Sequence, residues 1–168
     1  MTPYFTFAGY SGSGKTTLVI KVISYLKEKG LKIAALKHDG HKFEMDKEGK
    51  DTYRMKQAGA ECIAIANNEK YAVISNTEKR LNFFELMEKV PNGMDIIIGE
   101  GFKDDNVPKI LVHRTATGKP NLYNSERNII GVATDDIYLF QSVENVFNIN
   151  DYEKISEFII EYIANFNK

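Results

Sequence analysis

Apolar runs and one helical stripe alternate along the first forty residues. Residues 4–8 are mostly apolar and aromatic, which is typical of a short strand. Apolar residues then recur at helical spacing over residues 18–26, and Gly30 is well placed to end that helix. Residues 31–36 are again mostly apolar, as a strand covered on both faces should be. This order predicts a βαβ unit, whose right-handed crossover makes its two strands parallel.

The rest of the chain continues the alternation. Residues 67–70 are polar and separate two apolar runs, which predicts a β-hairpin. Asn150 and Glu153 have the spacing of a capping box that would open a last amphipathic helix. Further helices are expected over residues 52–58 and 78–90, and strands over 61–66, 71–75, 94–98, 109–113 and 128–133. The pattern predicts one three-layer α/β domain over residues 1–168, with a largely parallel sheet flanked by helices and a β-hairpin extension.

Composition narrows the class of protein. The chain has 168 residues, 43% of them hydrophobic and 27% charged, which suits one folded domain. Its net charge of −1 gives no overall basic excess to meet nucleic acid. The start lacks the pattern of a signal peptide, and no apolar run approaches the roughly 18 residues of a membrane span. We therefore expect a cytoplasmic protein that binds neither nucleic acid nor a membrane.

The first predicted turn carries a phosphate-binding motif. It reads GYSGSGKTT from Gly9 and matches G-x-x-x-x-G-K-[ST] between a strand and a helix. Its glycines let successive N–H groups face phosphate oxygens at a helix N-terminus. The lysine would reach the β- and γ-phosphates and the first threonine hydroxyl would bind Mg²⁺. The candidate nucleotide-binding residues are Gly12, Ser13, Gly14, Lys15, Thr16 and Thr17, in a P-loop NTPase-like fold.

A magnesium-bound nucleotide also needs an acidic residue at the carboxyl end of a neighbouring strand. The strand predicted over residues 94–98 offers Asp95 at its start and Glu100 just past its end. Ligands of open parallel sheets bind at the carboxyl edge. We therefore expect Glu100 to bind Mg²⁺ or position water, with Lys15 as the other catalytic candidate, and Asp95 to be a cap or turn residue.

A polar loop follows the second strand and emerges on the same edge as the phosphate loop. Residues 21–56 hold ten Lys and Arg against six Asp and Glu, so the neutral total conceals a basic stretch. The spacing His38-x-x-His41 is compatible with a transition metal, and a mobile polar loop is another interpretation. We favour capture of an anion, with Asp39 or Asp46 helping to hold Mg²⁺. The candidate anion-binding residues are Lys37, His38, His41, Lys50 and Arg54.

Several motifs occur in series. The phosphate loop is followed by KHDGH at 37–41, DKEGKDT at 46–52, QAGA at 57–60 and EGFK at 100–103. Together they resemble the molybdopterin-guanine dinucleotide biosynthesis protein B (MobB) family. The resemblance implies a homodimeric GTP-binding protein with Mg²⁺ and weak GTPase activity. It would assist the molybdenum cofactor guanylyltransferase that attaches GMP to molybdopterin. The basic loop would then face the pterin phosphate or the nucleotide, and the hairpin would take part in dimerisation.

Guanine selectivity in P-loop proteins commonly depends on an aspartate after a late strand. Asp135 follows the strand predicted over residues 128–133 and offers that chemistry, although a full N-K-x-D motif is absent. Helix capping or solvent exposure is the alternative for this side chain. No arginine finger is evident near the phosphate loop, which fits slow hydrolysis. A P-loop kinase of a small metabolite and a nucleotide-dependent adaptor without turnover are the alternative functions.

Overall fold

The computed structural model describes residues 1–123 and 126–166. Its contacts divide the chain into two compact units. The first combines Met1–His38 with the segment that begins at Asn82, and the second is Asp39–Leu81. The organisation of the whole chain as a single domain stays a prediction.

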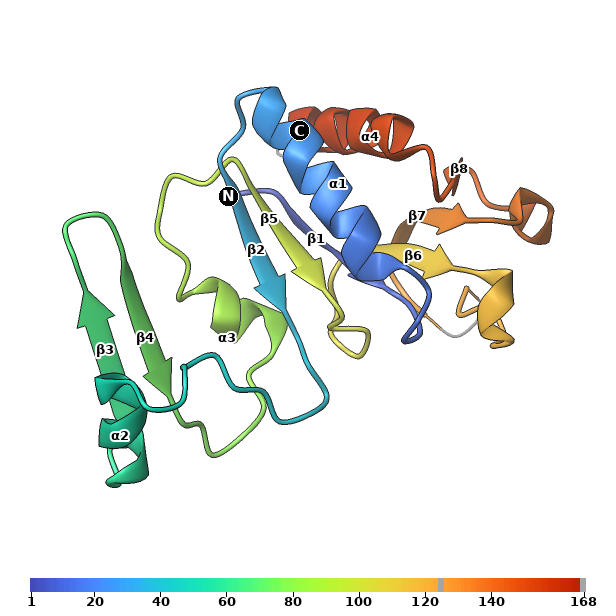
Figure 1. Ribbon diagram of the computed structural model, residues 1–168. Coiled ribbons are helices and arrows are strands. Elements are labelled where there is room, and N and C mark those ends of the chain that lie inside the picture. Colours follow the sequence, from blue (N-terminus) through green and yellow to red (C-terminus); the bar gives the residue numbers. More distant parts are fainter. Residues whose placement is uncertain (124–125, 167–168) are drawn as a thin grey trace. The chain divides into compact units, whose positions relative to one another are not determined.

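The first unit is built on a six-stranded sheet in the order β2-β5-β1-β6-β7-β8 (Figure 1). Every neighbouring pair in it is parallel, which confirms the predicted P-loop NTPase-like α/β fold. Because β1 lies between β5 and β6, its carboxyl end opens where ligands of such sheets bind. The strands are β1 (Tyr4–Ala8), β2 (Ile33–Lys37), β5 (Ile96–Glu100), β6 (Lys109–His113), β7 (Ile129–Thr134) and β8 (Val146–Asn148).

Two long helices cover one face of this sheet. They are α1 (Lys15–Glu28) and α4 (Tyr152–Asn165), which lie side by side in Figure 1. Phe5 and Phe7 alternate along β1 and bury their rings on this face. The helices contribute Leu18, Val19, Val22, Leu26, Ile155 and Ile159 to the same buried cluster. This packing fixes the start of α1, and with it the phosphate loop, against the end of β1.

The opposite face is covered by shorter pieces. Phe83 of α3 (Phe83–Met87) is fully buried, together with Phe102 and Val107 from the crossover between β5 and β6. Farther along, Phe140 from a short 3₁₀ turn, η2 (Ile137–Phe140), packs on the strands. The three-layer arrangement is thus confirmed.

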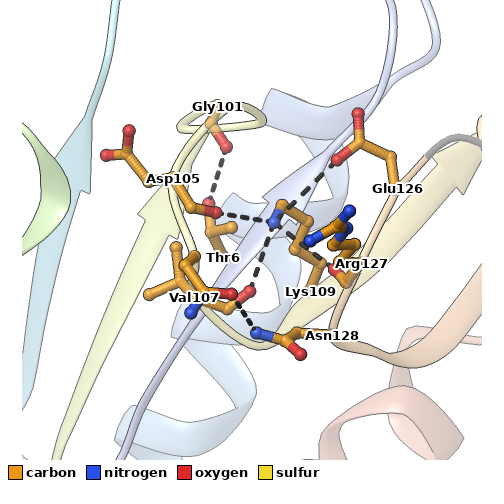
Figure 2. Close-up of polar contacts among 9 residues, drawn as sticks. Thr6, Gly101, Asp105, Val107, Lys109, Glu126, Arg127 and Asn128 are labelled. Atoms are coloured by element: carbon orange, nitrogen blue, oxygen red, sulfur yellow. Dashed lines mark hydrogen bonds and ion pairs between the residues drawn. The ribbon is translucent and has the colours of Figure 1, made fainter.

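A buried lysine holds the crossover between β5 and β6, which contains no helix (Figure 2). Lys109 is 2% exposed, and its Nζ donates to the carbonyl oxygen of Asp105 over 2.7 Å. The carbonyl oxygens of Val107 and Arg127 each lie 3.4 Å from Nζ, and Oε2 of Glu126 lies 3.9 Å away. One ammonium group therefore joins the crossover to the segment that precedes β7.

The second unit contains a short helix and the predicted hairpin. The helix is α2 (Asp51–Gln57), and β3 (Cys62–Ala66) pairs antiparallel with β4 (Tyr71–Ser75). The side chain of Asn67 accepts hydrogen bonds from the backbone N–H groups of Glu69 and Lys70, which stabilises the turn. The β-hairpin extension is thus confirmed.

Several predicted boundaries were wrong. The helix expected over 78–90 is confined to α3, because Asn82 and Glu85 form a capping box that starts it at Phe83. The last helix is capped by Asp151, whose carboxylate accepts from Lys154 N, and not by Asn150. The strand expected over 94–98 lies two residues later, and the short strand β8 was not predicted. Within the described ranges, no helix is long and apolar enough to cross a membrane.

Candidate nucleotide-binding site

The loop between β1 and α1 has a backbone that side chains would not tolerate. Gly12 and Gly14 have φ of 80° and 88°, in the left-handed region that favours glycine. A Cβ at Gly9 would lie 2.3 Å from the carbonyl oxygen of Val112, so only glycine fits beside β6. Gly14 is the N-cap of α1 and offers its first turn no side-chain acceptor. The loop therefore presents backbone N–H groups at a helix N-terminus, as a phosphate requires.

Ser13 contributes a buried hydroxyl to this loop. Its side chain is 1% exposed, and its Oγ makes no hydrogen bond within the described part of the chain. Buried hydroxyls in native structures nearly always have a partner. A bound anion would supply an acceptor here, so this orphaned atom fits the phosphate-binding role predicted for the loop.

Lys15 folds back over the loop. Its Nζ donates to the carbonyl oxygen of Tyr10 over 2.7 Å. Desolvation by burial lowers the pKa of Lys15, the charge of Glu100 opposes this shift, and Lys37 adds to it. The ammonium is thus held at the loop in a place where an anionic ligand would favour its charged form.

Glu100 is brought to the first turn of α1. The hydroxyl of Thr16 donates to Oε1 of Glu100 over 2.7 Å, and the Nζ of Lys37 lies 3.5 Å from the same oxygen. Glu100 is the last residue of β5, and its register neighbours are Lys37 on β2 and Phe7 on β1. A hydroxyl beside a carboxylate is an oxygen pair that suits Mg²⁺, so these residues fit the ion.

The alternative acid, Asp95, serves a turn. It precedes β5, and its Oδ2 accepts a hydrogen bond from the backbone N–H of Lys32 over 2.7 Å. Thr17 lies on the exposed first turn of α1, next to Thr16. The structure therefore gathers Lys15, Thr16, Lys37 and Glu100 around one loop and leaves Asp95 outside.

Asp135 lies on the other side of β1, directly after β7. Its Oδ1 accepts from the backbone N–H of Thr115 and its Oδ2 from the Thr115 hydroxyl, each over 2.9 Å. Thr115 begins the 3₁₀ turn η1 (Thr115–Thr117). Desolvation raises the pKa of Asp135, but the two Thr115 hydrogen bonds and the charge of Arg114 outweigh it, so the pKa is lowered. A carboxylate accepts about four hydrogen bonds, so acceptor sites are left for a ligand.

A cavity of about 330 Å³ adjoins Asp135 at the carboxyl ends of β7 and β8. Its lining includes Ile137, Phe147 and Asn148, and the charged residues Asp136, Asp151 and Lys154 also contribute to it. Apolar and amide groups beside an ionised carboxylate are a suitable surrounding for a flat heteroaromatic ring with N–H donors.

Arg114 is a candidate that sequence reasoning missed. It follows β6, and a Cβ on Gly14 would lie 3.5 Å from its Nη2. The two residues are far apart in the chain, and only the neighbouring positions of β1 and β6 bring them together. Its place directly after a predicted strand was the signal that could have found it.

The polar loop is divided between the two units. Lys37 and His38 belong to the first, where the backbone N–H of His38 donates to the carbonyl oxygen of Glu100 over 2.9 Å. The others belong to the second, where Asp39 Oδ1 accepts from His41 N. In the second unit lie Asp39, His41, Asp46, Lys50 and Arg54.

Local structure in the second unit accounts for some of these side chains. Lys50 is the N-cap residue of α2, and Arg54 lies in its last turn. The hydroxyl of Thr52 donates to Oδ1 of Asp46 over 3.0 Å. Among the residues that the structure describes, no three His, Cys, Asp or Glu side chains gather as metal ligands. Their roles toward an anion or a metal stay predictions.

Comparisons with known proteins agree with this architecture. The family model of molybdopterin guanine dinucleotide synthesis protein B matches residues 4–135. The chain is 36% identical to the molybdopterin-guanine dinucleotide biosynthesis adapter protein of Haemophilus influenzae, over 98% of this chain and 92% of that protein. It is 34% identical to the protein of the same name from Escherichia coli, over 99% and 97%.

Solved structures give the same result. A crystal structure of molybdopterin-guanine biosynthesis protein B superposes with a TM-score of 0.73 at 26% identity, covering 94% of this chain and 98% of that one. The crystal structure of Bacillus subtilis MobB shares the fold, with a TM-score of 0.74 at 24% identity and 95% and 96% coverage. The family match over most of the chain, together with these relatives, shows that this protein belongs to the molybdopterin guanine dinucleotide synthesis protein B family.

Proposed function

We propose that this protein is a GTP-binding adapter in the formation of molybdopterin guanine dinucleotide, with weak GTPase activity. One observation carries the nucleotide part of the proposal. The hydrogen bond from Thr16 to Glu100 places a hydroxyl and a carboxylate beside a phosphate loop whose backbone only glycines allow. The adapter part is supported by the two bacterial relatives, which are molybdopterin-guanine dinucleotide biosynthesis adapter proteins.

The chain's own residues bind the phosphates and do little chemistry. The loop N–H groups and Lys15 would neutralise the β- and γ-phosphates, and Lys37 adds a second cation beside Glu100. Thr16 and Glu100 would hold Mg²⁺, which when bound supplies charge neutralisation at those phosphates. We also assign the positioning of water to Glu100. Its carboxylate is already engaged by Thr16 and Lys37, which fits a slow hydrolysis.

Guanine selectivity is assigned to Asp135. Its ionised carboxylate would accept from the ring N–H and the exocyclic amine of guanine, and the adjoining cavity would hold the ring. Adenine offers an acceptor where guanine carries that ring N–H, so the same carboxylate would disfavour ATP.

The partner that we propose is a molybdenum cofactor guanylyltransferase in the cytoplasm, with molybdopterin held near the basic residues of the second unit. We also propose a homodimer. The hairpin exposes Ile65, Tyr71 and Val73, each more than half accessible, which supports a role in association.

Calorimetry tests the nucleotide assignment. Wild-type protein in Mg²⁺ should bind GTP and GDP more tightly than ATP, and Lys15→Ala should lose that binding while retaining its fold. Tighter binding of ATP, or transfer of phosphate to a metabolite without a partner protein, would contradict the proposal and favour a kinase.

The adapter role is tested by reconstituting dinucleotide synthesis with the transferase. Lys15→Ala should reduce product formation, and an unchanged yield would show that the nucleotide is irrelevant.

A further inference from the structure

Arg114 lies against the phosphate loop although it is remote in sequence. It follows the last residue of β6, and β6 neighbours β1 in the sheet. A Cβ on Gly14 would lie 3.5 Å from Nη2 and 3.7 Å from Nε of Arg114. The planar guanidinium is therefore positioned along the last glycine of the loop. The side chain is half-buried, so it is partly shielded from solvent at this place.

The charges around the loop fall on two sides of β1. On the β5 side, Glu100 contacts Thr16 and Lys37, the groups assigned to the ion and the terminal phosphates. On the β6 and β7 side lie Arg114 and Asp135. Since a bound nucleotide must run across the loop, its terminal phosphates point to the first side and its nucleoside to the second.

The second side is connected by hydrogen bonds. Thr115, next to Arg114, donates both its backbone N–H and its hydroxyl to the carboxylate of Asp135. The charge of Arg114 also acts on that carboxylate. The guanidinium is thus near the glycine that ends the phosphate loop, and its charge also acts on the carboxylate assigned to the base.

We infer that Arg114 is a nucleotide-binding residue that contacts the nucleoside monophosphate half of the bound nucleotide. The inference rests on the proposed nucleotide binding and adds a residue to it. A guanidinium suits this place because it donates to phosphate oxygens in its plane and stacks on flat rings with its face. Its position away from Glu100 separates this role from that of an arginine finger, which acts at the transferred phosphate.

The test compares ligands that contain or lack the nucleoside. Calorimetry in Mg²⁺ measures GDP, GTP and inorganic pyrophosphate, which stands for the two terminal phosphates, with wild-type protein, Arg114→Ala and Arg114→Lys. Arg127→Ala is the matched control. Its side chain is exposed, and the residue lies just before the amino end of β7, at the edge of the sheet opposite to the phosphate loop. Arg114→Ala should weaken GDP and GTP alike by about tenfold or more, the loss expected for one charge-assisted contact. Pyrophosphate affinity and the thermal unfolding midpoint without ligand should stay at wild-type values.

Arg114→Lys should recover part of the affinity, since it keeps the charge without the planar fork, and it provides the readout if Arg114→Ala does not fold. Loss confined to GTP would assign Arg114 to the γ-phosphate, and an equal loss for pyrophosphate would assign it to the terminal phosphates. Either result overturns the inference. Unchanged nucleotide affinity in both variants would overturn it while guanine binding by wild-type protein stands.

The wild-type protein itself tests the proposed function. If it prefers ATP, the guanine assignment fails, and the same series of measurements with ADP and ATP decides the role of Arg114. Wild-type protein that binds no nucleotide overturns both.

Discussion

The hydroxyl of Thr16 lies 2.7 Å from Oε1 of Glu100, which is 84 residues farther along the chain. The contact joins the first turn of α1 to the last residue of β5, so the phosphate loop and the acid have a fixed relationship before any ligand binds. Groups that are already in position bind an ion without the entropic cost of being ordered first.

We predict that Glu100→Gln removes the dependence of GTP affinity on Mg²⁺. Glutamine keeps an acceptor for Thr16, so the local contact survives while the charge that would hold the ion is lost. GTP affinity in Mg²⁺ should fall about tenfold, the order of one charge-assisted contact, and GDP affinity in EDTA should not fall. Asp95→Asn is the matched control, because Asp95 serves a turn at the other end of β5. Equal Mg²⁺ dependence in Glu100→Gln and wild type would contradict the assignment.

Nucleotide affinity should fall at alkaline pH through Lys15. Desolvation lowers the pKa of Lys15 in the free protein, and bound phosphates would raise it again. The ligand therefore favours the protonated form, so binding takes up a proton, and affinity decreases as pH rises through the lowered pKa. Titrations from pH 7 to pH 10, roughly the span below the ordinary lysine pKa, in buffers of different ionisation enthalpy measure this uptake. Affinity that rises with pH would exclude this role for Lys15.

We predict that Asp135→Asn changes base preference. Asparagine has one acceptor and one donor where aspartate has only acceptors, so it suits xanthine, whose 2-oxo group replaces the guanine amine. GTP affinity should fall by roughly 10- to 100-fold, because polar groups would be left mismatched, and xanthosine triphosphate should gain. Asp95→Asn is again the control, because Asp95 serves a turn before the start of β5, away from this cavity. An unaltered ratio of the two affinities in Asp135→Asn would place base reading elsewhere.

Lys109→Met should destabilise the first unit without a direct effect on the site. Methionine fills similar space but leaves the carbonyl oxygen of Asp105 and the neighbouring acceptors without their donor. The expected loss is about 2–4 kcal/mol of unfolding free energy, from urea denaturation. Exposed Lys119→Met should change it by less than about 0.5 kcal/mol. If Lys109→Met lost less than about 0.5 kcal/mol of unfolding free energy, water would have replaced the ammonium as the donor to these carbonyl groups.

Local signals predicted more of this molecule than long-range ones. The phosphate loop and α1 could be predicted because a glycine motif between an apolar strand and an amphipathic stripe is written within one short stretch. Glu100 was placed correctly at the carboxyl edge although its strand lies two residues later than predicted. Gly99 explains part of that error, since a glycine suggests a strand end, whereas here a Cβ would lie 2.7 Å from Thr6 Oγ1 in the packed sheet.

Features that depend on the order of strands could not be read in the same way. The proximity of Arg114 to Gly14 requires β6 to lie beside β1, and periodicity does not contain that information. The buried position of Lys109 is similar, because its carbonyl partners come from an irregular crossover and from the segment before β7. A lysine at the start of a strand is ordinarily assigned to the surface.

The central position of β1 also has a consequence for the time at which the site forms during synthesis. The loop sequence is complete by Thr17, yet β1 pairs only with β5 and β6, and Gly9 rests on the carbonyl group of Val112. Pairings between such distant segments form late, because a long loop must close first. On the ribosome, β3 and β4 of the second unit can pair as soon as both have been synthesised. The phosphate loop, in contrast, lacks the neighbouring backbone of Val112 until β6 has emerged. Nascent chains shorter than this would carry the motif without the ability to bind a nucleotide.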